Sequence, residues 1–454
     1  AGAVHDFAAL VASVRHGGKS IGEVIGDNVG PGGRVLFLLF AWLTLLLVIA
    51  AFTNIVASTF ASVPESATSS VLFMLLAVGF GYAVYRANRG LVVSSVVGVI
   101  LLFLAVYLGY LFPFKIGANE WKWILLVYIA AASTVPVWIL LQPRDYLNSF
   151  LLYASLGAAL IGIVAFNPTF IMPAYTGFEA QAIGFLFPML FVTVACGAIS
   201  GFHALVASGT TAKQLSTEAH AKRIGYGSML IECFLAITAI TAASVMTSQQ
   251  YGDLMKGGAF AVYANGIASL LQGYGIPLAF GVTFFTLAAS AFALTSLDTA
   301  ARLGRYTLQE LGSCEGFSRV PGLGNRYIAT GLTLVAAAIL LFSGQFAAIW
   351  PMFGAANQLV AALALLAVAV WLANQKRANA FVLYPMIFML VVTMSALVLM
   401  FQQRLSQGNW MLAIMSAVLF LLALVLAWMG YQILSGARKA PELARVAGGS
   451  GKAD

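Results

Sequence analysis

Long apolar runs, separated by short polar stretches, dominate the chain. Segments 35–51 and 360–373 contain no charged residue, and with their flanks each approaches the roughly 20 residues that an α-helix needs to cross a bilayer. Strands of a membrane barrel would instead alternate apolar and polar residues over about 10 positions. The pattern therefore predicts a polytopic bundle of transmembrane α-helices, which satisfy their own backbone hydrogen bonds in lipid.

The apolar segments predict about 13 crossings, the first of them partial. A further segment, 259–273, is shorter and less apolar, and we expect an interfacial or re-entrant helix there. The candidate crossings are 1–15, 33–60, 69–85, 91–112, 122–141, 145–166, 184–210, 224–246, 277–310, 327–343, 347–373, 380–401 and 411–434.

Composition agrees with a membrane location. Of the 454 residues, 61% are hydrophobic and 8% are charged, whereas a soluble domain carries roughly 25% charged residues. So few charges cannot cover a water-soluble surface of this size. The chain is therefore expected to lie in a lipid bilayer, and soluble enzymes and disordered scaffolds are excluded.

Lysines and arginines lie mostly in alternate connections between the predicted helices. One set of connections holds 19 of them, and the other holds the remaining four of the 23, namely Lys115, Lys122, Lys256 and Arg404. Because basic residues collect on the cytoplasmic side, this split predicts a cytoplasmic C-terminus. It also explains the net charge of +8 as a topology signal, so we expect no nucleic-acid partner.

The three cysteines, Cys196, Cys233 and Cys314, lie in or beside apolar segments. They show neither metal-ligand spacing nor a disulfide framework, and we predict no metal and no cofactor. The chain begins at Ala1 without a methionine, and its first residues resemble the second half of a membrane helix. We therefore expect further residues upstream.

Two prolines interrupt segment 122–150. Pro136 and Pro143 each remove a backbone donor, and Ser133 and Thr134 precede the first of them. One interpretation is a kinked helix followed by an ordinary turn. The other is a discontinuous helix whose free backbone groups line a polar cavity.

Small and polar residues interrupt segment 184–211 in a different way. Gly197 and Ser200 lie among other small residues, which can serve close helix packing in lipid. Packing does not explain His203, nor the polar residues that follow it. These are Ser208, Thr210 and Thr211.

Asn357 lies in the first half of segment 345–373, next to Gln358 and shortly after Pro351. Amide side chains can hold membrane helices together by hydrogen bonds. Packing and substrate contact are therefore both open for Asn357.

Carboxylates inside apolar segments are rare here. Glu232, Asp298 and Asp6 are three of them, and such groups usually mark ion or proton paths. Arg302 lies one helical turn after Asp298, so a local ion pair is the simpler interpretation for that residue.

Six stretches, spread in order along almost the whole chain, resemble the carbon starvation protein A family of bacterial inner-membrane transporters. They are AGAVHDF (1–7), VPVWILLQPRDYL (135–147), LFPMLFVTVACGAISGFHALVASGTT (186–211), IGYGSMLIE (224–232), LDTAARLGRYTLQEL (297–311) and WPMFGAANQL (350–359).

The resemblance implies a five-plus-five inverted-repeat core of the amino-acid/polyamine transporter superfamily. It implies that the first core helix lies upstream of residue 1 and that core helices two to ten occupy 1–311. Additional transmembrane helices would occupy 312–435, and a cytoplasmic tail 436–454. Segments 1–15 and 122–141 would be core helices two and six.

The resemblance also implies uptake of peptides or pyruvate across the bacterial inner membrane, by alternating access and in symport with protons. Na⁺ is the alternative coupling ion. We expect the cargo site between 133–146 and 196–211, with Arg144 and Asp145 as a gate. The expected ion-coupling residues are Glu232, Asp298, Asp6, Ser208, Thr210 and Thr211. The expected substrate-binding residues are Ser133, Thr134, Pro136, Trp138, Gln142, Gly197, Ser200, His203 and Asn357.

Two alternatives remain at this stage. A membrane enzyme or redox subunit would need catalytic or haem-ligating motifs, but the chain has no H-E-x-x-H or G-x-S-x-G and only four histidines. A channel or non-transporting sensor would be expected to show charge rings or repeated filter loops. Neither the choice between peptide and pyruvate nor the coupling ion follows from the sequence.

Overall fold

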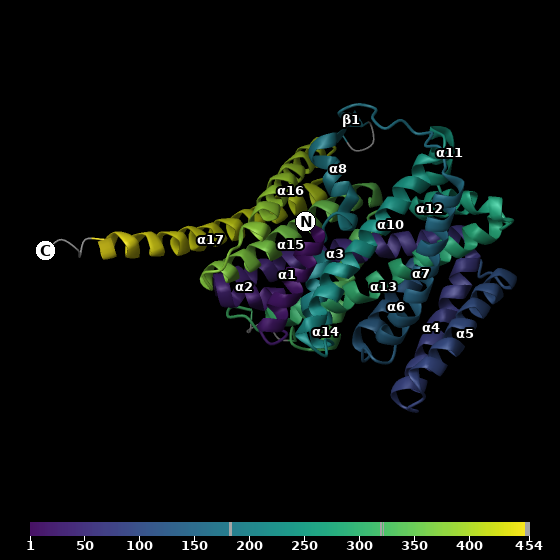
Figure 1. The fold of residues 1–454 in the computed structure, drawn as a ribbon, viewed down its shortest axis with the longest axis horizontal. Helices are drawn as coiled ribbons and strands as arrows, with labels where there is room; N and C mark the ends of the chain where they lie inside the picture. The colour runs from purple at the N-terminus through teal and green to yellow at the C-terminus, as the bar shows by residue number, and fades with distance from the viewer. Residues whose placement is uncertain (181–183, 318–319, 321, 450–454) are drawn as a thin grey trace.

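The computed structural model of the chain describes residues 1–180, 184–317, 320 and 322–449. These residues are almost entirely helical, with one two-stranded antiparallel ribbon (Figure 1). The α-helices are α1 (Gly2–Arg15), α2 (Ile21–Val29), α3 (Pro31–Ser62), α4 (Pro64–Tyr85), α5 (Leu91–Leu111), α6 (Ala118–Thr134), α7 (Leu141–Phe166), α8 (Leu186–Val194), α9 (Gly201–Gly209), α10 (Gly227–Ser244), α11 (Ser248–Met255), α12 (Ala259–Leu271), α13 (Leu278–Gly312), α14 (Arg326–Phe342), α15 (Phe346–Asn374), α16 (Ala380–Ser406) and α17 (Trp410–Gly449).

The remaining elements are short. The ribbon pairs β1 (Glu179–Ala180) with β2 (Gly184–Phe185). Short 3₁₀ or π turns are η1 (Ala195–Gly197), η2 (Thr211–Lys213), η3 (Glu218–His220), η4 (Lys222–Tyr226) and η5 (Gln272–Tyr274).

Among the described residues, nine helices are long and apolar enough to cross a membrane. The prediction of an all-α polytopic membrane protein is confirmed. The predicted count of about 13 crossings, the first of them partial, is higher than these nine. Helix α1 has 14 residues, as expected for a partial crossing, whereas α6 and α14 have 17 each and the expected crossing at 184–210 is divided into α8 and α9.

Helix α15 lies at the centre of the bundle. Its most apolar stretch is wholly buried, and it contacts α3, α9, α16 and α17. Alanines such as Ala361 and Ala364 have no exposed surface, which lets these neighbours approach closely. The candidate functional site is built on this helix, although the family resemblance implied that it is one of the additional C-terminal spans.

The helices at the periphery present apolar side chains outward. Helices α4 and α5 form a hairpin at one edge (Figure 1), where Val92 and Val93 are 77% and 68% exposed. Exposed valines of this kind suit a surface that meets lipid tails. Helix α17 extends away from the bundle on the opposite side (Figure 1).

Candidate functional site

The chain is broken between α8 and α9, at the expected crossing 184–210. Helix α8 ends at Val194, the turn η1 follows, and Ser200 is extended (φ −130°, ψ 121°) before α9 begins. Asn357 of α15 stabilises this break, since its Oδ1 accepts hydrogen bonds from the Phe202 N–H at 2.8 Å and from Ser200 Oγ at 3.3 Å. Asn357 thus satisfies a backbone donor that the start of a helix leaves without an intrahelical partner.

A glycine makes this approach possible. A Cβ built at Gly201 would lie 2.2 Å from the backbone oxygen of Asn357 and 2.3 Å from the Val360 Cβ. Only glycine therefore allows the first turn of α9 to rest directly on α15. The position of every side chain on α9 depends on this contact.

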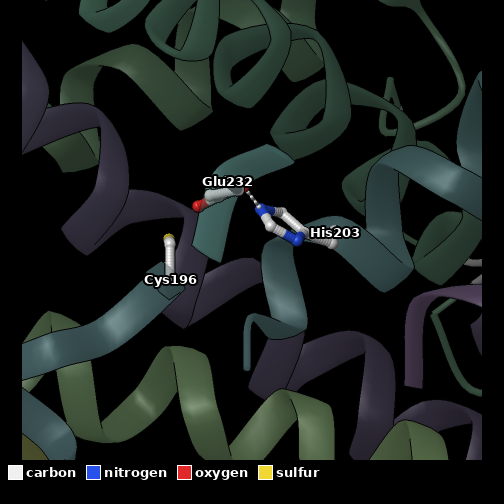
Figure 2. A group of neighbouring side chains, drawn as sticks. All are labelled: Cys196, His203 and Glu232. Carbon is white, nitrogen blue, oxygen red and sulfur yellow. Dashed lines mark ion pairs between the residues drawn. The ribbon is translucent and has the colours of Figure 1, made fainter. Parts of the chain in front are cut away.

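His203, in the first turn of α9, lies between two carboxylates. Its Nδ1 is 2.9 Å from Asp6 Oδ2 of α1, and its Nε2 is 3.1 Å from Glu232 Oε2 of α10. His5 supports the first carboxylate, because its Nδ1 lies 2.7 Å from Asp6 Oδ1. Figure 2 shows His203 and Glu232 facing one another, with Cys196 of η1 beside them.

The donors and acceptors of this cluster limit the protons that it can hold. A neutral imidazole donates from only one nitrogen, and an ionised carboxylate only accepts. Donation from both nitrogens of His203, to Asp6 and to Glu232, therefore needs one proton beyond those of a neutral His203 with two ionised carboxylates. The cluster is a place where a proton can be held and released.

Close backbone packing brings α1 to this cluster. A Cβ at Gly225 in η4 would lie 2.9 Å from the Phe7 Cα, and one at Gly2 would lie 2.5 Å from the Ala198 oxygen. The π-helical turn η4 and the break after η1 thus hold α1 from two sides. As a result Asp6, which is 7% exposed, reaches a histidine 197 positions later in the chain.

A cavity of about 560 Å³ opens beside the cluster. Three carboxylates line it, those of Asp6, Asp145 and Glu232, whereas no lysine or arginine does among the described residues. Aromatic rings of Phe52, Phe292 and other residues form its apolar walls. The remaining lining residues are Leu10, Val48, Leu152, Cys196, Phe202, His203, Val206, Ala207, Thr211, Ile224, Gly225, Ser228, Met229, Ile231, Leu235, Thr295, Ser296, Thr299 and Phe353.

A second charged network lies behind Asp145. Arg144, with no exposed surface, forms an ion pair with Asp298 of α13, which is equally buried. Tyr128 of α6 donates to Asp298 Oδ2 at 2.6 Å and accepts from Arg144 Nη1 at 2.9 Å. Arg144 Nη2 also lies 3.5 Å from Asp145 Oδ1, so the network reaches the cavity through Asp145.

Arg302 does not pair with Asp298 as the four-residue spacing suggested. Its Nη2 donates instead to the carbonyls of Ala132, at 2.7 Å, and of Val135. In an uninterrupted helix the Ala132 carbonyl would accept from residue 136, but that residue is a proline without an N–H. Arg302 therefore takes the place of the missing donor at the end of α6.

Comparison with known proteins identifies the family. The sequence model of the family described as "Carbon starvation protein CstA" matches residues 1–256 and 253–396. The chain belongs to this family. Its curated relatives are named as transporters, which makes the chain a nutrient transporter of the membrane and not an enzyme.

Several relatives are similar over most of the chain. The Peptide transporter CstA of Escherichia coli (strain K12) is 31% identical over 87% of this chain and 67% of its own length. The Pyruvate/proton symporter BtsT of the same organism is 31% identical over 87% and 68%, and the Campylobacter jejuni Peptide transporter CstA is 30% identical over 87% and 66%. This chain thus spans about two thirds of the length of these relatives.

Among solved structures, a manganese transporter of Eremococcus coleocola aligns with 96% of this chain and 95% of its own. The TM-score is 0.45 and the sequence identity is 14%.

The structure brings some of the predicted site residues of this CstA-family chain together. Those that line the cavity are His203, Asp6, Glu232, Thr211 and Asp145. The remaining predicted residues do not line it, although several support it. Asn357 and Ser200 hold the break before α9, and Ser208 Oγ accepts from the Ile21 N–H at 3.0 Å, which fixes α2.

The proline-interrupted stretch after α6 lies apart from the cavity. The chain loses α-helical structure between Thr134 and Leu141 as expected, but Ser133, Pro136 and Trp138 do not line the cavity. Ser133 Oγ lies 3.4 Å from the Ala301 oxygen, and the Trp138 ring lies beneath the Arg86 guanidinium at 5.2 Å. The other predicted residues outside the cavity lining are Thr134, Gln142, Arg144, Gly197, Thr210 and Asp298.

Sequence reasoning missed several cavity residues. Cys196 lines the cavity, although its spacing to the other cysteines is unlike that of a metal site. Thr295, Ser296 and Thr299 line the cavity from α13. These three residues, at positions i, i+1 and i+4, lie on one face of the helix. A polar stripe of this kind in an otherwise apolar helix is the sequence signal that could have indicated them.

Proposed function

We propose that this chain is a secondary transporter that takes up small peptides across the bacterial inner membrane by alternating access, in symport with protons. The proposal rests on one observation above all. A cavity of about 560 Å³ opens against a histidine held between two carboxylates.

The charge of the cavity favours a peptide over pyruvate. Its charged lining consists of Asp6, Asp145 and Glu232 with His203, so a cargo with a free ammonium group is attracted by opposite charges. Pyruvate carries a carboxylate with no ammonium group to offset it, so the same groups would repel it. The volume also lies within the usual range of 300–1,000 Å³ for small-molecule pockets, whereas pyruvate would leave most of it unfilled.

His203 is the proposed proton carrier. The proton shared among His203, Asp6 and Glu232 lies at the cavity wall, where the arrival of a cationic amine and the release of a proton affect one another. Asp6 belongs to α1, His203 to α9 and Glu232 to α10. A change in protonation therefore alters the attraction among three helices, which is the coupling that alternating access needs.

Arg144 and Asp145 are the proposed gate. Asp145 faces the cavity, while Arg144 is buried behind it at 3.5 Å and paired with Asp298. An ammonium group that binds Asp145 competes with Arg144 for the same carboxylate. Cargo binding is thereby transmitted to the contact between α7 and α13.

Uptake of radiolabelled dialanine into proteoliposomes that contain the purified chain tests this proposal. We expect saturable uptake driven by an inward proton gradient, retained when Na⁺ is replaced by choline. His203→Gln should abolish it, while His220→Gln in the short turn η3 should leave it unchanged, because His220 lies outside the cavity lining.

Competition experiments separate the cargo classes. Excess unlabelled dialanine should compete fully, and N-acetyl-dialanine and pyruvate should compete at least about tenfold less well, because neither carries an ammonium group. Equal competition by pyruvate would contradict the peptide assignment. A requirement for Na⁺, with no response to a proton gradient, would contradict proton coupling.

We also propose that the C-terminus lies in the cytoplasm, because basic residues collect in alternate connections. A reporter fused to the C-terminus, active on only one side of the membrane, tests that orientation.

A further inference from the structure

Three side chains with different donor atoms converge at the cavity wall. The thiol of Cys196, the imidazole of His203 and the carboxylate of Glu232 bring their donor atoms within 4.8 Å of one another. They come from η1, α9 and α10 (Figure 2), and all three residues line the cavity. Cys196 and His203 lie on either side of the break between α8 and α9, and Glu232 reaches them from α10.

We propose that Cys196, His203 and Glu232 form a binding site for a divalent transition-metal ion of the Zn²⁺ class. Sulfur, nitrogen and oxygen donors together are the ligand set of protein zinc sites, whereas Ca²⁺ and Mg²⁺ select oxygen donors. This site goes beyond the proposed transport function, and its existence does not depend on which cargo the cavity takes.

The geometry requires only a small movement to accept the ion. With metal–ligand distances of about 2.0–2.3 Å and tetrahedral angles, donor atoms of one site lie roughly 3.3–3.8 Å apart. His203 Nε2 and Glu232 Oε2 are already 3.1 Å apart. Since no two donor atoms are more than 4.8 Å apart, the remaining separations have to close by about 1 Å at most. The Glu232 side chain, which is 32% exposed, has room to turn.

Asp6 supplies an independent indication. Protein zinc sites commonly hold a ligating histidine by a hydrogen bond from its other ring nitrogen to a carboxylate, which fixes the tautomer and orients the ring. Here His203 Nδ1 lies 2.9 Å from Asp6 Oδ2, and Nε2 points toward Glu232. His5 in turn lies 2.7 Å from the other Asp6 oxygen. The histidine is thus oriented to present Nε2 to an ion.

Three protein ligands leave one tetrahedral position, which opens into the cavity that they line. A bound ion would take the place of the proton between His203 and Glu232. Zn²⁺ should therefore inhibit the proposed transport by competing with protons, but binding can be measured without any transport assay. The failure of the metal site and the failure of the transport proposal are therefore distinguishable.

Metal binding to the purified, tag-free chain at constant pH is the direct test. We expect equilibrium dialysis with Zn²⁺ to show one tight site per chain, and Co²⁺ at this site to give the near-ultraviolet charge-transfer absorption of a thiolate ligand. Cys196→Ser and Glu232→Gln should each weaken Zn²⁺ binding at least about tenfold, and Asp6→Asn by about 10–100-fold through loss of the orienting hydrogen bond. Cys196→Ser should also abolish the thiolate absorption.

The other cysteines provide matched controls. Cys233→Ser on α10 and Cys314→Ser beyond the end of α13 should leave both the affinity and the absorption unchanged, because neither residue belongs to the cluster. Co²⁺ binding without thiolate absorption would overturn the proposal. So would wild-type Zn²⁺ affinity in both Cys196→Ser and Glu232→Gln. If either variant fails to elute as a folded species on size exclusion, the remaining one still decides the outcome.

Discussion

Neutralising one member of the buried Arg144–Asp298 pair should destabilise the protein severely. Both side chains have no exposed surface, so Arg144→Gln leaves the Asp298 charge buried without its partner. Asp298→Asn does the same to Arg144. Removing one member of a buried ion pair typically costs 3–5 kcal/mol of folding free energy, and we expect about that loss from each single substitution.

The double variant provides the decisive comparison. Arg144→Gln combined with Asp298→Asn removes both charges and leaves two amides that can hydrogen-bond to each other and to Tyr128. Since isolated buried charge is the main source of the cost, the double variant should recover most of the stability that each single variant loses. The two substitutions should therefore be strongly non-additive.

Unfolding in one detergent, followed by tryptophan fluorescence, measures these differences. The Asp253–Lys256 pair serves as the control, because its side chains are 61% and 79% exposed and exposed pairs contribute about 0–1 kcal/mol. Asp253→Asn should therefore change stability by less than about 1 kcal/mol. Single variants of the buried pair that lose no more than this control, or a double variant equal to the sum of the singles, would refute the reasoning.

Three further predictions concern the break and the cavity. Gly201→Val should lower the free energy of unfolding, because its Cβ would lie 2.2 Å from the Asn357 backbone oxygen. Gly331 faces open space, so Gly331→Ala should change this free energy little or raise it by up to about 1 kcal/mol. Asn357→Leu should cost about 1–3 kcal/mol in the same unfolding assay, because the Phe202 N–H loses its acceptor; an unchanged stability would count against that role. In a chain whose native cysteines are replaced by serine, Thr299→Cys should react with a small water-soluble thiol reagent, because Thr299 lines the cavity. Ser290→Cys, which is fully buried, should not react, and a Thr299→Cys variant as unreactive as this control would contradict a water-accessible cavity.

Much of the fold could be predicted from the sequence because hydrophobic length is a local property. Unbroken apolar runs such as 360–373 are enough to indicate a membrane helix. The interruption at Pro136 was equally local, since a proline removes its own backbone donor. Pro143 was misleading for the same reason, because the structure places it in the first turn of α7, where a missing N–H costs nothing.

The candidate site was only partly predictable. Asp6, His203 and Glu232 each stood out as polar groups in apolar surroundings, but nothing local indicates that residues 197 positions apart touch. Asp298 illustrates the difficulty. Its spacing to Arg302 predicted a pair on one helix, yet Asp298 pairs with Arg144, 154 positions earlier, because Arg302 is occupied by the carbonyls that the end of α6 leaves free.

The two interruptions of the chain therefore have different consequences. Arg302 fills the break at Pro136 with its own donors, so the freed carbonyls are satisfied within the protein. At the break before α9, the Asn357 side chain of α15 accepts the hydrogen bond of the Phe202 N–H. His203 and Cys196 are left facing the cavity. A discontinuous helix offers a binding site only where its polar groups still face open space, and in the described part of this chain the α8–α9 break meets that condition.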